Sequence, residues 1–202
     1  AGEMVGTTAF CARRRIPGHR VVIAQIDTGF MLDHPALQGR LGSDGIDLSG
    51  DGRANAAYDT RQRGATYWHA TAVASVLAGN TDENVKILPY KVVRFGTDTC
   101  AASAVLAAME DAVAKGARVL NMSLSTSQNR AGFAAMMDKA AALGVAVCCS
   151  AGNAGAQVSN RYPSALPQTI TVSAVTADKT VAGFSNYGDL VDYCAPGSHI
   201  TV

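Results

Sequence analysis

Two kinds of apolar run alternate along this chain. Short β-branched runs, such as VVIAQI at 21–26, are typical of buried strands. Longer runs rich in alanine, such as AASAVLAAMEDAVAK at 101–115, are typical of helices and stop at a glycine. The pattern predicts helices at 69–78, 101–115 and 130–143. Further strands are predicted at 85–93, 117–123, 145–150, 169–175 and 190–194.

This alternation predicts an α/β fold, with a doubly wound, mainly parallel sheet and helices on both faces. The uninterrupted apolar run at 145–149 fits a strand that is covered on both sides. Ligands of such sheets bind beyond the carboxyl ends of the strands. Asp27, residues 121–123 and residues 150–153 all lie at such ends, so they are candidate functional positions.

The chain of 202 residues is long enough for one domain with a sizeable core. We predict an N-terminal arm at 1–19 and a single domain at 20–202. Within that domain, residues 39–64 are rich in Gly, Asp, Asn and Arg. This composition predicts surface loops, with room for a short hairpin.

Composition and charge argue against several classes of protein. The formal net charge of +1 and the 16% of charged residues indicate no nucleic-acid partner. No apolar run reaches the roughly 18–20 residues of a membrane span, and no signal-peptide core is present. The five cysteines are an odd number without a C-x-x-C, and the histidines are scattered, so we expect no zinc site. We therefore predict no cofactor and no membrane span.

Asp27-Thr28-Gly29, directly after the first strand, has more than one interpretation. An aspartic protease needs two such loops on an all-β fold, but this chain has one and its middle is helical. A nucleotide-binding loop needs several glycines, and DTGFMLDH has one. The remaining interpretation is a carboxylate that orients a histidine. It fits His69 at the start of a predicted helix and the SAGNAG segment at the end of a predicted strand.

Five segments in one order then resemble the subtilisin-like serine proteases (subtilases). They are VVIAQIDTG with DHPAL, HATAVASVLAG, VLNMSLS, SAGNAG with YPSALPQTITVSAV, and FSNYGDLVDYCAPG, and together they span roughly residues 20–202. The resemblance implies a catalytic domain that hydrolyses peptide bonds. By the same analogy, it implies that the protein is secreted.

The resemblance also implies a role for particular residues. His69 would exchange the proton of a serine hydroxyl, Asp27 would orient His69, and Asn153 would donate to the oxyanion. We expect the Asp27 and His69 side chains to be in contact. The segment that binds an extended peptide substrate would be Ser123, Leu124 and Ser125. Ala151 and Gly152 would line the pocket for the residue before the scissile bond.

The chain departs from the subtilase pattern at the nucleophile. The family carries it in a G-T-S motif soon after the APG run, and no G-T-S occurs here. Ser198 follows APG but lacks the motif. In the resembling fold the serine begins a buried helix. Apolar burial contributes about 25 cal/mol per Å². Without that helix, the free energy lost with the missing burial would exceed a typical net stability of about 5–15 kcal/mol. We therefore expect a companion chain that supplies the serine. A truncated chain, or an inactive homologue that binds peptides or regulates, remains the alternative.

Smaller departures concern the substrate cleft and calcium. Ala70 and Ser125 stand where the family pattern has glycine. The loop at 80–85 is too short for the calcium loop that often follows the histidine helix in the family. A calcium site among Asp44, Asp47 and Asp51 is a weaker alternative.

Overall fold

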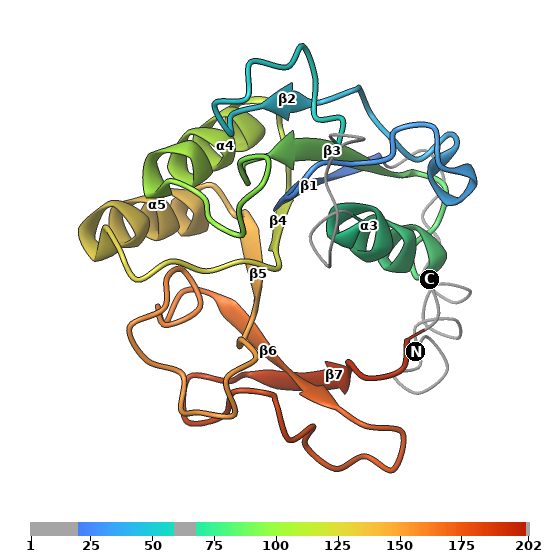
Figure 1. Cartoon of the computed structure of the whole chain (residues 1–202). Helices are drawn as coiled ribbons and strands as arrows, with labels where there is room; N and C mark the ends of the chain where they lie inside the picture. Colours follow the sequence, from blue (N-terminus) through green and yellow to red (C-terminus); the bar gives the residue numbers. More distant parts are fainter. Residues whose placement is uncertain (1–19, 59–67, 201–202) are drawn as a thin grey trace.

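The computed structural model describes residues 20–58 and 68–200. The predicted arm at 1–19 lies outside the described residues. In the described part, seven strands form one sheet in the order β2-β3-β1-β4-β5-β6-β7, and every neighbouring pair is parallel (Figure 1). The strands are β1 (Val21–Asp27), β2 (Ile46–Asp47), β3 (Val85–Lys91), β4 (Val119–Met122), β5 (Ala146–Ser150), β6 (Ile170–Val175) and β7 (Tyr193–Pro196).

The helices cover both faces of this sheet, as the sequence predicts. They are α3 (His69–Gly79), α4 (Ala102–Ala114) and α5 (Arg130–Ala142), with a short 3₁₀ helix η1 (Pro35–Leu37). In Figure 1, α4 and α5 lie on one side of the sheet and α3 on the other. The larger core joins Ile26 and Leu120 to Phe133 of α5. The smaller core joins Ala74 of α3 to Phe30.

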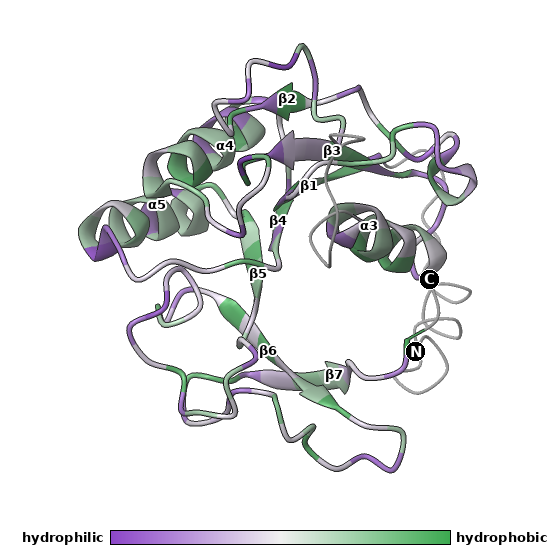
Figure 2. Ribbon diagram, viewed as in Figure 1, coloured by the Kyte–Doolittle hydropathy of each residue, from purple (hydrophilic) through white to green (hydrophobic). Residues whose placement is uncertain are grey.

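Apolar side chains follow this layering. Figure 2 shows hydrophobic colouring along β5 and β6 and on parts of the helices, and more polar residues in the loops near β2. In the described part of the chain, no helix combines the length and apolar character of a membrane span.

Two expectations about strands need correction. The hairpin considered within 39–64 is wrong for the described residues, because β2 pairs in parallel with β3 through Ile46 and Tyr90. The last strand begins at Tyr193 rather than at 190, since residues 188–191 form a turn in which the Val191 N–H donates to the Gly188 carbonyl. The first difference comes from a tertiary contact and the second from a turn, and the local apolar pattern reports neither.

A buried lysine occupies the place considered for calcium. Lys91 is 0% exposed, and its ammonium donates to Asp51 at 2.5 Å, to the Ser49 hydroxyl at 2.6 Å and to the Val93 carbonyl at 2.9 Å. Asp47 lies 3.6 Å from the same ammonium. Among residues 20–58 and 68–200, no group of three or more His, Cys, Asp or Glu is arranged to hold a metal. The Lys91 ammonium is therefore the cation next to these two carboxylates, and it balances one of their two negative charges.

The strand order places one end of β1 at the point where the winding reverses. From β1 the chain moves to β3 on one side and later crosses to β4 on the other. Loops diverge at such a point and leave a crevice beyond the carboxyl ends of the strands. Asp27, the last residue of β1, lies there.

Candidate active site

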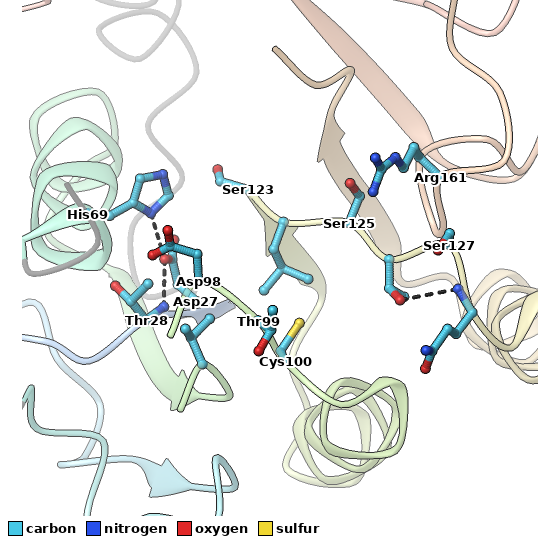
Figure 3. A pocket seen from close by; sticks show the side chains of 14 residues that line it. Asp27, Thr28, His69, Asp98, Thr99, Cys100, Ser123, Ser125, Ser127 and Arg161 are labelled. Atoms are coloured by element: carbon cyan, nitrogen blue, oxygen red, sulfur yellow. Dashed lines mark hydrogen bonds and ion pairs between the residues drawn. The ribbon is translucent and has the colours of Figure 1, made fainter. Parts of the chain in front are cut away.

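A carboxylate and an imidazole are in contact at this crevice. Asp27 is 1% exposed, and its Oδ1 lies 2.7 Å from His69 Nδ1 (Figure 3). The same oxygen accepts a hydrogen bond from the Thr28 backbone N–H at 2.6 Å. Gln25 donates its Nε2 to Asp27 Oδ2 at 3.3 Å. These donors hold the carboxylate in one orientation, facing the ring, and the expected contact is confirmed.

The start of α3 is attached to the Asp27 loop by side chains. His69 is its first residue, and Trp68 before it provides no side-chain cap. Instead the Thr28 hydroxyl accepts from the Ala70 N–H at 3.1 Å, and Gln25 donates to the Ala70 carbonyl at 2.8 Å. The free Ala70 N–H is thus satisfied by Thr28, the residue after β1, which fixes where His69 lies.

Gly29, in the loop after Asp27, has to be glycine because the backbone of Tyr58 passes close to it. A Cβ at Gly29 would lie 2.3 Å from Tyr58 Cα, closer than any real side chain allows. The next residue, Phe30, donates its N–H to the Ala56 carbonyl and accepts from the Tyr58 N–H, each at 3.0 Å. These two hydrogen bonds hold the loop after Asp27 against the 56–58 segment.

The contact with Asp27 defines the protonation of the imidazole. The hydrogen bond to Asp27 raises the pKa of His69 above its usual value. It outweighs partial burial, which acts in the opposite direction. An ionised carboxylate only accepts, so Nδ1 carries the proton of the neutral ring and Nε2 holds the free lone pair. The side chain is 40% exposed, so this nitrogen can meet a proton donor from outside.

A cleft of about 430 Å³ opens beside His69. Ser123, Leu124 and Ser125 form one wall, in the segment that continues β4 after its pairing with β5 ends at Met122. Asp98, Thr99 and Cys100 line the cleft with them (Figure 3). Because the Ser123–Ser125 segment has left the sheet ladder, its backbone is placed to pair with an extended peptide.

A second groove, of about 460 Å³, shares His69 and Ser123 with the cleft. The exposed Asn153 lines it, together with Ala151 and Gly152. Val73, Val76 and Leu77 contribute the outer face of α3. Asn121, which also lines the groove, has a buried Nδ2 without a hydrogen-bond partner in the described structure. The groove is therefore lined by half-buried apolar side chains and an unsatisfied donor.

The loop that carries Asn153 is held by Asn186, a residue that the sequence motifs do not single out. Asn186 is 6% exposed; its Oδ1 accepts from the N–H groups of Ala154 and Ala156 at 2.9 and 3.1 Å. Its Nδ2 donates to the Ala151 carbonyl at 2.9 Å. The only signal in the sequence is its place in the FSNYG segment.

A second glycine of the site, Gly152, is also required by its backbone. It has a φ of +104°, and a Cβ there would lie 2.6 Å from Asn186 Nδ2. Glycine is needed at this position for both reasons. The Gly152 and Asn186 contacts together determine the direction in which Asn153 leaves the loop.

The structure brings the residues predicted for catalysis and substrate binding around one shared rim. Among the residues that the structure describes, no hydroxyl is hydrogen-bonded to His69. Ser198, the serine after APG, lies 3.4 Å from His199 Nδ1 instead. Cys148 lines the groove, and burial raises the pKa of its thiol, which keeps it protonated.

Comparisons with known proteins find subtilisin-like proteases among the proteins that this chain resembles. Halolysin from Haloferax mediterranei is 33% identical over 191 residues, which cover 89% of this chain and 35% of that protein. A solved structure described as a lanthipeptide protease has a TM-score of 0.73 and 27% identity, covering 90% of this chain and 56% of its own. A cold-adapted subtilisin-like serine proteinase has a TM-score of 0.69 and 30% identity, covering 92% and 66%.

The relatives are longer than this chain. It spans only 35% and 45% of the length of the first curated relatives that it matches. The sequence model of the Subtilase family matches residues 18–201, nearly the whole chain. This chain belongs to the subtilase family.

Proposed function

We propose that this chain is part of a serine endopeptidase and carries its acid and base, Asp27 and His69, together with an oxyanion donor, Asn153. The observation that carries the proposal is the 2.7 Å contact between Asp27 and His69 at the rim of a cleft. The names of relatives, such as "subtilisin-like protease" and "serine proteinase", support the same chemistry.

In the proposed reaction, His69 Nε2 removes the proton of a serine hydroxyl as the oxygen attacks the substrate carbonyl. The imidazolium that forms is stabilised by Asp27 and then protonates the leaving amine. Asn153 donates its side-chain amide to the carbonyl oxygen as negative charge develops. Ser123, Leu124 and Ser125 align the peptide, and Ala151 and Gly152 border the pocket for the residue before the scissile bond.

We further propose that the serine comes from a segment or companion chain outside these 202 residues. The absence of a G-T-S motif from the sequence and the groove next to His69 support this. A helix seated in that groove would cover Val73, Val76 and Leu77 and would reach His69. It would also offer a partner to Asn121 Nδ2.

The test is active-site labelling of the complete protein, expressed from its full coding sequence. A fluorophosphonate probe is expected to label one serine beyond residue 202, identified by peptide mass spectrometry. His69→Ala should abolish labelling and lower peptide hydrolysis by roughly 10⁴–10⁶-fold, the range found when triad members are removed from subtilisin. Ser198→Ala should leave labelling unchanged.

Absence of a labelled serine would contradict the proposal. It would favour the alternative, an inactive homologue that binds peptides or regulates another protein. By family resemblance we also propose that the protein acts outside the cell. Detection of the labelled enzyme in the culture medium, rather than in the cell fraction, would test this location.

A further inference from the structure

Arg161 lies in the substrate cleft at a position set by backbone pairing. The next residue, Tyr162, exchanges two hydrogen bonds with Thr126, at 2.9 and 2.7 Å. This bridge fixes the Arg161 segment against the strand-like segment that begins at Ser123. In Figure 3 the Arg161 side chain lies beside Ser125 and Ser127, across the cleft from His69.

The guanidinium of Arg161 has no anionic partner within the described part of the chain. The side chain is exposed, and the cations of the ion pairs found between described residues are His69, Lys91, Lys115 and Lys139. Its neighbours along the cleft wall, Ser125, Ser127 and Gln128, are neutral. A cation that lies among neutral polar groups, with no anion from the described residues, favours a ligand carboxylate.

The negative charges of the cleft do not neutralise Arg161. Asp27 is occupied by His69 and the Thr28 N–H. Asp98 lines the cleft beside Thr99 and Cys100, on the segment after β3, and forms no ion pair in the described structure. The cleft is therefore positive along the Ser125–Ser127 wall and negative along the Asp98 wall.

We propose that Arg161 determines specificity by pairing with an acidic side chain of the substrate, on the residue that lies along the Ser125–Ser127 wall. This rests on the proposed peptidase function and names its substrate class: peptides with Glu or Asp at one position near the scissile bond. The planar, five-donor guanidinium suits a carboxylate better than an ammonium would, and no rearrangement of the described residues is needed to free it.

The test uses the complete protein and a set of peptides that differ only by Glu, Gln or Lys at each position near the scissile bond. At one position the unmodified protein should favour Glu over Gln by about 2- to 5-fold in kcat/KM, the size expected for an exposed ion pair. Arg161→Gln should remove this preference, and Arg161→Glu should reverse it towards Lys. Because the pair is exposed, the preference should weaken at high salt.

Arg130→Gln is the matched control, because Arg130 is an exposed arginine at the start of α5 that lines neither the cleft nor the groove. It changes the net charge equally and should leave the Glu to Gln ratio unchanged. An unchanged ratio in Arg161→Gln, with its Tm intact, would overturn the proposal. If the complete protein hydrolyses no peptide, calorimetric Kd values for the Glu and Gln peptides decide instead. Equal Kd values would then reject the role of Arg161, independently of whether the chain catalyses.

Discussion

At the scale of single residues, the site depends on partners that orient a few functional groups. The Asp27 carboxylate accepts hydrogen bonds from the Thr28 N–H and the Gln25 amide, and its Oδ1 also contacts His69 Nδ1. Burial of Asp27 removes competing water, so the hydrogen bond to the imidazole is stronger than it would be at the surface. The properties of His69 are therefore set largely by one neighbour.

The pH dependence of His69 follows from this contact. Its pKa is raised above 6.5, chiefly by the hydrogen bond to Asp27, and only the neutral ring can accept a proton. We expect kcat/KM of the complete protein to rise with pH through this raised value. Asp27→Asn should move the His69 titration to lower pH, measured by NMR of the imidazole protons, and lower turnover by roughly 10⁴-fold.

The hydrogen bond that raises the pKa of His69 also stabilises the fold, but only at pH values at which His69 is protonated. This contribution is fully present below the pKa of the unfolded chain, near 6.5, and is lost as pH rises through the folded value. An NMR titration in which Asp27→Asn leaves the pKa of His69 unchanged would contradict the assigned cause.

Asn186 is a positioning residue for Asn153. Asn186→Ala would remove two acceptor contacts and one donor contact from the loop at 151–156, so Asn153, the proposed oxyanion donor, would lose its fixed direction. We expect kcat to fall by about 10- to 100-fold with a small change in KM, below the roughly 10²–10³ expected for Asn153→Ala itself. Steady-state kinetics of both variants and of the double variant checks this. A double variant no slower than Asn153→Ala would show that the two act through one contact.

At the scale of elements, the strands are long enough to be recognised from their apolar runs, but the loops are ordered by buried charge. Lys91, at the end of β3, holds the loop after β2 through Asp51 and Ser49. Burial raises the pKa of Asp51. Hydrogen bonds from Lys91 and the Phe95 N–H, together with the Lys91 charge, lower it by more, so the net pKa is below its usual value. Asp51 therefore contributes stability at neutral pH.

This contribution should disappear in acid. Because the folded pKa of Asp51 is lowered, its stabilisation is present above the unfolded pKa of about 3.8 and is lost as pH falls through the folded value. We expect Asp51→Asn to lower the free energy of unfolding by about 1–3 kcal/mol at pH 7 and by less at pH 3. Urea unfolding in a His69→Ala background, which prevents self-digestion, measures it.

Asp33 offers a control for that experiment, since it is exposed and makes no ion pair with the described residues. Asp33→Asn should change the free energy of unfolding by no more than about 0.5 kcal/mol at either pH. A loss of stability in Asp51→Asn that is equal at pH 7 and pH 3 would indicate that charge is not its source.

At the scale of the whole molecule, the two faces of the sheet are covered unequally. Among the described residues, helices α4 and α5 pack on one face along β1, β4 and β5, whereas α3 is the α-helix on the other face (Figure 1). The groove beside α3 extends past β5 to β6 and β7. The side chains that line it from α3 are half-buried in the described chain, so a covering segment would bury them further.

The stability of the complete protein should therefore depend on the α3 side chains that line the groove. We expect Val73→Lys to lower its free energy of unfolding by about 2 kcal/mol, because the substituted side chain would place a charge under the covering segment. Thermal and urea unfolding in the His69→Ala background checks this. Leu143→Lys, at a side chain that is 50% exposed after α5, should cost less than about 0.5 kcal/mol. Equal effects of the two substitutions would contradict a covered groove.

Much of the architecture could be predicted because it depends on local patterns. Apolar runs, glycine stops and their alternation indicate β3, β5 and the α-helices α3, α4 and α5 within a residue or two. The parallel pairing of β2 could not be predicted, since two residues carry no periodicity and their partner is distant in sequence. The late start of β7 depends in the same way on a turn and on pairing with β6.

The sequence by itself determined the fold class, the family resemblance and the residue types available for catalysis. Residue types and the periodicity of apolar positions are local properties, so they can be read from the sequence directly. Only the tertiary structure decided that Asp27 contacts His69, that Asn186 holds the Asn153 loop, and that Lys91 fills the acidic cluster. It also decided that Arg161 faces the cleft without an anionic partner among the described residues. The contacts of Asp27, Asn186 and Lys91 each join residues far apart in sequence, and packing of the whole sheet brings these residues together.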